Sequence, residues 1–187
     1  MIHWNYLLSL EKDIIRLSNY IEFCEENFNV FSIEILKLNL SIGSEIDVVL
    51  KQTCKLFNPI GKYESIKDYK IFLNENLDSA IKEKVSIPRY NIELQPWESI
   101  GNKKNYKYEN PFWWDNYNNV KHHRDSEYNK ANLKNLLYSF SALVIVNLHR
   151  MIKINNITDL SDTFEILPEL EMFNLDEKYY VTILRID

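Results

Sequence analysis

The sequence is poor in glycine, proline and cysteine. Its 187 residues include only 3 glycines, 5 prolines and 2 cysteines. All-β sandwiches and phosphate-binding folds with glycine-rich loops need more turn residues than this, so the scarcity argues against both classes. Cys24 and Cys54 each lie inside a helical pattern without a CxxC partner, which predicts buried, reduced thiols rather than a disulfide or a metal site. The composition therefore favours helices.

The sequence also lacks a strong excess of positive charge. Its 22 basic and 27 acidic residues give a formal net charge of −5. A chain with this balance has no global field that attracts nucleic acid or anionic lipid. The first residues, MIHWNYLLSLEKD, have no basic region before a long apolar core, so they do not predict a secretion signal. We expect a cytoplasmic protein without a membrane partner.

Apolar residues recur at spacings of three and four along most of the chain, the pattern of amphipathic helices. A hydrophobic fraction of 45% and a charged fraction of 26% are typical of one globular domain, which we expect to cover residues 1–187. The pattern predicts helices over segments 4–25, 30–57, 65–84, 110–124 and 128–153. The helix at 30–57 has a wide apolar arc and is expected to be central. Four polar residues line the boundary of that arc and are expected to meet a neighbouring helix: Glu34, Ser41, Glu45 and Gln52.

Strand signals are few. Residues 88–96 alternate apolar and polar side chains between two prolines, which predicts a short strand. The polar stretch 99–110 is predicted to be a surface loop. Residues 161–187 form a C-terminal extension, and its KYYVTILRI segment is a candidate for a further strand. The predicted fold is thus mostly α, a helical bundle with a small β element.

Reactive side chains are concentrated in one segment, residues 113–124, with the sequence WWDNYNNVKHHR. On a helix, Asn118, Lys121 and His122 fall at i, i+3 and i+4, so these three can act on one ligand. A histidine can transfer a proton near neutral pH, a lysine can stabilise negative charge on a phosphate, and an asparagine can orient either group. These three are the candidate catalytic residues.

Further candidates surround this group. Trp114 lies on the same flank of the predicted helix as Lys121, and Arg124 falls on the side that carries Trp113; Trp114 and Arg124 are candidate binding residues. Glu45, from the helix at 30–57, would complete the site if it pairs with Lys121 or orients the histidine. An ordinary amphipathic helix with a solvated polar face explains the same pattern and weighs against catalysis. No HxxxH, HExxH or CxxC spacing accompanies the histidines, so we expect no metal and no cofactor.

Three stretches of the sequence resemble a family of uncharacterised bacterial proteins: FSIEILKLNLSIGSEIDVVLKQTCKLF, IPRYNIELQPW and PFWWDNYNNVKHHRDSEYNKANLKNLLYSFSAL. The most recognisable piece of that family is a WWxxYNxVKHxR string, here Trp113 to Arg124. The family is similar to the HEPN-type helical domains of prokaryotic toxin and phage-defence systems. This resemblance implies a helical bundle, often dimeric, in which some members cleave RNA without a metal and others are inactive binding modules.

The chain departs from the ribonuclease signature of such domains, an arginine followed four to six residues later by a histidine. No arginine in this sequence has a histidine at that distance: Arg16, Arg89, Arg124, Arg150 and Arg185. We therefore expect a HEPN-like module of a defence or toxin–antitoxin system that binds protein or nucleic acid. One alternative is a metal-independent ribonuclease using Asn118, Lys121 and His122. The other is a purely structural subunit, and self-association is expected in each case.

Overall fold

The computed structural model describes residues 2–104, 107–158 and 169–179. This part of the chain contains seven α-helices and two small antiparallel sheets. The helices are α1 (Ile2–Leu17), α2 (Ile33–Phe57), α3 (Ile66–Asn76), α4 (Asp78–Lys82), α5 (Phe112–His122), α6 (Arg124–Glu127) and α7 (Leu133–Ile154). The strands are β1 (Val85–Ile87), β2 (Ile92–Leu94), β3 (Lys103–Lys104) and β4 (Lys107–Tyr108). The prediction of a mostly helical protein with a small β element is confirmed.

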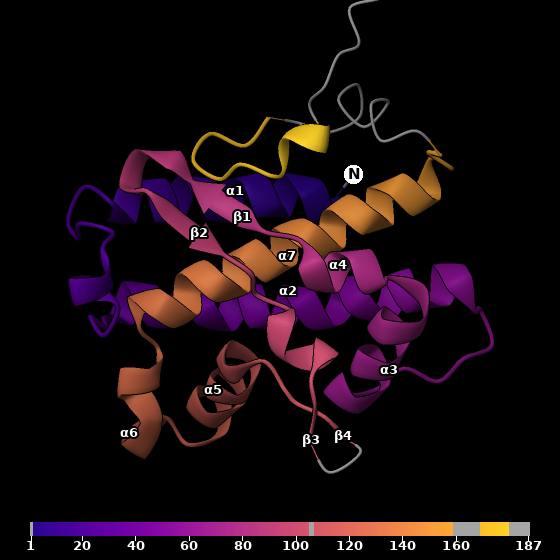
Figure 1. Ribbon diagram of the computed structural model, residues 1–187. Coiled ribbons are helices and arrows are strands. Elements are labelled where there is room, and N and C mark those ends of the chain that lie inside the picture. The colour runs from indigo at the N-terminus through magenta and orange to yellow at the C-terminus, as the bar shows by residue number, and fades with distance from the viewer. Residues whose placement is uncertain (1, 105–106, 159–168, 180–187) are drawn as a thin grey trace, which may run out of the picture.

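Helices α2 and α7 form the centre of the molecule. Helix α7 contacts both α1 and α2, and Figure 1 shows it running obliquely between them. The apolar arc predicted for α2 is buried at Ile35, Ile42 and Ile46. Helix α7 is long and apolar enough to cross a membrane by length and composition, and 67% of its most apolar window is buried inside the protein. That burial makes α7 the core helix of the bundle, as its nearly uniform apolar centre predicts.

Several helix ends differ from the prediction, because local polar groups decide where a helix stops. Helix α1 ends at Leu17 rather than near residue 25, and the Ser18 hydroxyl donates to the Ile15 carbonyl at 2.7 Å. Such a bond offers the backbone an alternative to the next helical turn. Helix α2 begins after Ser32, whose side chain accepts a hydrogen bond from Ile35 N. Helix α7 begins after Asn132 in the same way, not at residue 128.

The β elements partly match the prediction. The predicted strand at 88–96 is present as β2, which pairs antiparallel with β1 in the register Val85↔Leu94. The tight connection between them is a 3₁₀ turn followed by Asn91 at a φ of 51°, a left-handed conformation that asparagine tolerates. The predicted surface loop at 99–110 contains a short hairpin, in which β3 pairs with β4 and Glu109 N donates to Asn102 O at 3.2 Å.

The C-terminal extension packs onto the bundle over residues 172–179. The Glu11 carboxylate, only 2% exposed, accepts from the backbone N–H groups of Met172 at 2.9 Å and Phe173 at 3.3 Å. An isolated bridge joins Asn174 to Ser86 on β1. At the end of this segment the Lys178 ammonium binds the buried carboxylate of Glu83 at 2.8 Å. The candidate strand KYYVTILRI extends from Lys178 into residues 180–187, which lie outside the described residues.

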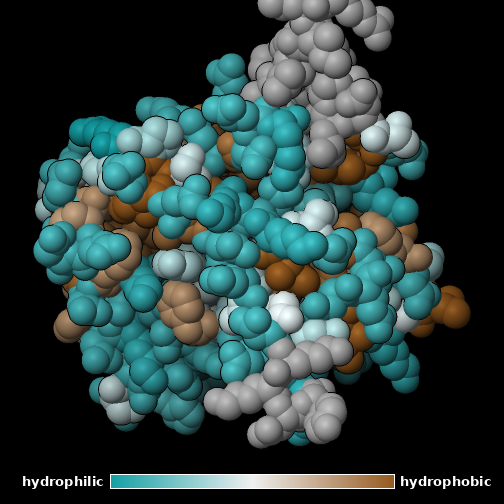
Figure 2. Space-filling view, viewed as in Figure 1, coloured by the Kyte–Doolittle hydropathy of each residue, from teal (hydrophilic) through white to brown (hydrophobic). Residues whose placement is uncertain are grey.

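A single large hydrophobic cluster joins α1, α2, α3, α7 and the β1–β2 hairpin. Trp97 and Trp113 are both nearly fully buried, with ring centroids 5.0 Å apart in an edge-to-face arrangement. Cys54 is buried in the same core, and burial raises the pKa of its thiol to about 12. Hydrophilic residues cover most of the face shown in Figure 2, and hydrophobic residues occupy smaller areas between them.

Candidate functional site

Helix α5, which carries the predicted site, is fixed against α2 by a close contact at Gly43. A Cβ atom added at Gly43 would overlap the ring of Tyr117, so only glycine leaves room for this ring. On the same side of α5, Trp113 donates from Nε1 to the Pro96 carbonyl at 2.8 Å. Trp113 is thus a core residue. These contacts set the height and rotation of α5 relative to α2.

A second set of bonds holds the start of α5. The Lys70 ammonium on α3 donates to the Tyr108 carbonyl at 2.5 Å and to Asn110 Oδ1 at 2.6 Å. Asn110 in turn donates from Nδ2 to Asp115 Oδ1 at 2.8 Å. Burial lowers the pKa of Lys70, and Asp115 partly offsets this effect. These bonds attach β4, Asn110 and the start of α5 to α3.

A hollow of about 370 Å³ lies where α2, the start of α3 and α5 meet. Three of the predicted site residues line it together, namely Trp114, Asn118 and Lys121. The rings of Trp114 and Tyr117 are largely buried, with centroids 5.7 Å apart. Asn118 donates from Nδ2 to the Trp114 carbonyl of its own helix at 3.0 Å, so its amide oxygen is the group left for another partner. The sequence thus placed these three residues on one surface correctly.

The charges around this hollow are not paired with one another. Its lining includes the carboxylates of Asp47 and Glu64 and the ammonium of Lys121. Lys121 lies over the Tyr117 ring at 5.5 Å and has no ion pair among the described residues. Asp47 accepts from the Tyr69 hydroxyl at 2.8 Å, and burial together with this bond raises the pKa of Tyr69. The lining therefore carries two negative charges and one positive charge.

His122 and Arg124 are not part of the hollow. Helix α5 ends at His122, and His123, with φ −133° and ψ 46°, breaks the helix before α6. Both His122 and Arg124 are exposed. The predicted continuous helix through Arg124 is wrong, and Arg124 does not share the packing side of Trp113. The predicted group of Asn118, Lys121 and His122 therefore does not form one site, because His122 lies outside the hollow that the other two residues line.

Glu45 faces the other flank of α2. Its Oε1 atom accepts from Nδ1 of His3 on α1 at 2.6 Å, and each side chain is 11% exposed. The expected pairing of Glu45 with Lys121 is wrong for a geometric reason. Residues two apart on a helix point about 200° apart, so Asp47 faces α5 while Glu45 faces α1. Glu45 does orient a histidine, but that histidine is His3.

The polar row predicted along α2 meets α1, as expected. Gln52 Oε1 accepts from His3 Nε2 at 2.9 Å, and Arg150 Nη2 on α7 donates to the same oxygen at 3.2 Å. His3, although close to the N-terminus, is thus bonded on both sides of its ring. Sequence reasoning missed Asp47, Glu64 and Arg150, because no periodic signal links them to α5 or α1. A lone glycine inside a helical pattern, Gly43, was the available sign of close helix packing.

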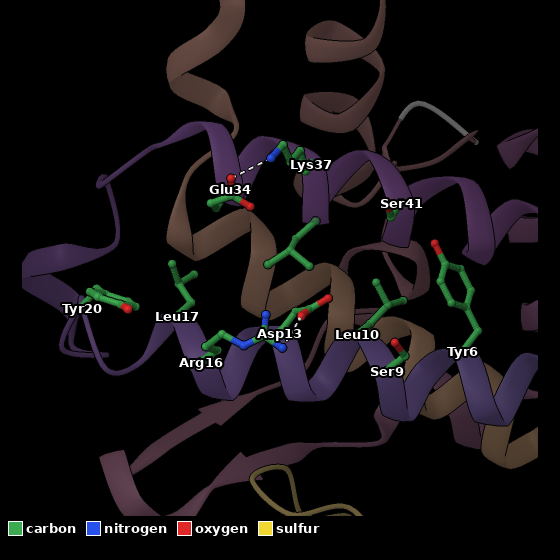
Figure 3. A pocket seen from close by; sticks show the side chains of 11 residues that line it. Tyr6, Ser9, Leu10, Asp13, Arg16, Leu17, Tyr20, Glu34, Lys37 and Ser41 are labelled. Atoms are coloured by element: carbon green, nitrogen blue, oxygen red, sulfur yellow. Dashed lines mark hydrogen bonds and ion pairs between the residues drawn. The ribbon is translucent and has the colours of Figure 1, made fainter.

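The remaining residues of the row line a groove of about 300 Å³ between α1 and α2 (Figure 3). Its apolar lining includes Leu10, Leu17 and Leu38. Its charges form two local ion pairs, Asp13 with Arg16 at 3.2 Å and Glu34 with Lys37 at 2.7 Å. This groove therefore presents charges that already neutralise each other, unlike the hollow beside α5.

Within the described residues, no group of three or more His, Cys, Asp or Glu side chains could hold a metal ion. Comparison with known protein families, curated proteins and solved structures found no match to this chain.

Proposed function

We propose that this chain is a HEPN-type helical module of a bacterial defence or toxin–antitoxin system that acts by binding a partner protein. The relation to HEPN-type domains comes from the resemblance around the WWxxYNxVKHxR string. The single observation that carries the binding role is the hollow between α2, α3 and α5. Its lining combines the buried rings of Trp114 and Tyr117 with charged groups that have no ion-pair partner among the described residues, and no histidine is among the residues described there.

The charge of the hollow favours a protein over a nucleic acid. Its two carboxylates, from Asp47 and Glu64, outnumber the ammonium of Lys121. Every phosphate of a nucleic acid would face this excess of negative charge, in a chain whose net charge is already −5. An arginine or lysine of a partner protein would instead bond to the carboxylates and stack on Trp114. The proposed ligand is therefore a cationic side chain presented by a protein.

Affinity capture from host cells tests this proposal. After nuclease treatment, we expect wild-type protein to retain a protein partner, and the double variant Asp47→Asn/Glu64→Gln to bind it about tenfold or more weakly, because charge-assisted bonds are lost. The variant Asp125→Asn removes an exposed carboxylate on α6 and should bind like the wild type. Equal capture by the double variant, or loss of the partner on nuclease treatment, would contradict the proposal.

The alternative, a metal-independent ribonuclease, needs a proton-transferring group beside Asn118 and Lys121. The hollow contains both residues but not His122. We expect purified protein to leave single-stranded RNA intact in the presence of a chelator. Cleavage that resists the chelator and disappears in both Lys121→Ala and His122→Ala would favour the ribonuclease instead.

Self-association is a separate part of the proposal. A second copy of this chain is the simplest partner protein, and a closed dimer would use one surface patch on both subunits. Light scattering on the purified protein measures the mass directly. A mass of two chains that falls to one in Asp47→Asn/Glu64→Gln would make the hollow the self-association surface.

A further inference from the structure

Two hydrogen-bond donors meet at one amide oxygen between α1, α2 and α7, and a third donor beside them has no partner among the described residues. The oxygen is Gln52 Oε1, which lies 2.9 Å from His3 Nε2 and 3.2 Å from Arg150 Nη2. The third donor is Arg150 Nε, which is buried and has no hydrogen-bond partner among the described residues. Nε–H and Nη2–H form the edge of a guanidinium that binds two oxygens of one anion side by side. A single amide oxygen satisfies only part of this edge.

The bonds also define which atoms donate at this oxygen. Arg150 can only donate, so Gln52 Oε1 must be the accepting atom of that amide. His3 Nε2 contacts the same oxygen and therefore faces it as a donor. On the other side of the ring, His3 Nδ1 lies 2.6 Å from Oε1 of Glu45.

The permanent cation of this cluster is Arg150, whose guanidinium bonds to Gln52. No ion pair with a carboxylate is observed for Arg150 among the described residues. Burial lowers the pKa of Arg150, and only Glu45 opposes this effect. The side chain of Gln52 is exposed, so a ligand has access to this edge of the guanidinium.

We propose that His3, Arg150 and the position now held by the Gln52 amide form a binding site for a phosphate-class oxyanion. A tetrahedral oxyanion has enough oxygens to accept from Nε and Nη2 of Arg150 and from Nε2 of His3 at once. It takes the place of Gln52 Oε1, whose side chain swings outward into solvent. Glu45 acts as a positioning residue that holds the His3 ring from its far side. This site lies on the opposite flank of α2 from the hollow and is independent of the proposed function.

The site is tested by titrating the purified protein with inorganic phosphate while following the Arg150 Nε–H signal by nuclear magnetic resonance. We expect a saturable shift of this signal with millimolar affinity. The variant Arg150→Lys keeps the charge but removes the two-donor edge, and it should bind about tenfold more weakly. The matched control Arg16→Lys, which alters an exposed arginine paired with Asp13, should bind as the wild type does.

A second variant separates the proposal from a purely structural role of the cluster. Gln52→Ala removes the oxygen that competes with the ligand, so it should tighten phosphate binding severalfold, although it deletes two hydrogen bonds. A nucleoside 5′-monophosphate titrated in parallel identifies the source, because tighter binding than phosphate shows a phosphoryl group on a larger ligand and equal binding shows free phosphate. Absence of a saturable shift, or weaker binding by Gln52→Ala, would overturn the proposal.

Discussion

At the scale of the residue, the rotation of a side chain about its helix decides which site it serves. Glu45 was the predicted acidic partner of Lys121, yet Asp47, two positions later, is the carboxylate that lines the hollow with it. The sequence shows that both acids lie on one helix, but it does not show which flank α5 covers. That depends on the contact of Gly43 with Tyr117, which joins positions far apart in the sequence. The flank of α5 itself, Trp114, Asn118 and Lys121, follows from helical spacing and was predictable.

The buried His149 side chain predicts how the free energy of unfolding depends on pH. Burial lowers its pKa to about 4, against about 6.5 in an unfolded chain. Between these values the unfolded chain binds a proton that the folded chain does not, so the free energy of unfolding falls as the pH is lowered. Denaturant unfolding should show a loss of about 2 kcal/mol from this group between about pH 6.5 and about pH 5.

The control for this effect is His149→Gln, which cannot take up a proton in this range. The variant differs from the wild type in overall stability, but its pH dependence should be shallower by the same 2 kcal/mol, roughly. Parallel pH profiles for the two proteins would show that His149 does not carry the effect.

At the scale of the element, hydrophobic periodicity predicted the long helices but not the short paired strands. Helices α2 and α7 were recognisable because their apolar spacing extends over many turns. The β3–β4 hairpin is built from two residues on each side and has no alternation to detect. Helix ends were missed for a related reason, since a single cap such as Ser32 or Asn132 decides them.

The packing of α5 on α2 predicts the effect of a methyl group at Gly43. In Gly43→Ala the new Cβ overlaps the Tyr117 ring, and overpacking of this kind costs about 1 to 3 kcal/mol. The better helix propensity of alanine returns about 1 kcal/mol, so we expect a net loss of up to about 2 kcal/mol in thermal or denaturant unfolding. Ser44→Ala, on the exposed side of the same turn, should lose nothing. A Gly43→Ala variant more stable than the wild type would refute the close contact, because only the gain in helix propensity would then remain.

The Glu11 carboxylate anchors the C-terminal segment 172–179, and we expect its removal to loosen that segment. Glu11→Ala leaves the backbone N–H groups of Met172 and Phe173 without their acceptor, which costs about 1 to 3 kcal/mol. We expect faster proteolysis within this segment, while the helical core resists. Glu22→Ala, which changes a carboxylate outside this contact, is the matched control. Uniform cleavage rates for both variants and the wild type would argue against the anchor.

At the scale of the whole molecule, the charge balance predicts how the protein treats RNA. A net charge of −5 and a hollow with excess negative charge disfavour nonspecific binding of the phosphate backbone of RNA. We expect filter binding to detect no complex with a generic single-stranded RNA at physiological salt. A salt-sensitive complex of micromolar affinity would show that a basic surface dominates and would contradict the choice of a protein partner.

The broad fold of the molecule was predictable, and its sites were predictable only in part. Composition and spacing were enough for a mostly helical protein, because scarce glycine and long amphipathic segments leave few other folds. The cluster around Gln52 was predictable only in part: the polar row with Glu45 and Gln52 was expected to meet a neighbouring helix, but no motif links it to His3 or Arg150. Sequence patterns report which face of an element is polar, but only the assembled helices define which polar faces meet.

The most direct test of the central claim is the identity of the molecule that contacts the hollow. A photoreactive amino acid at position 118, beside Lys121, is activated in host cells, and the crosslinked product is identified by mass spectrometry; the same group at Asp125 is the control. The account predicts a crosslink from position 118 to a protein, with a lower yield when Asp47→Asn and Glu64→Gln are added. Crosslinking to RNA, or equal yields of protein from both positions, would contradict it.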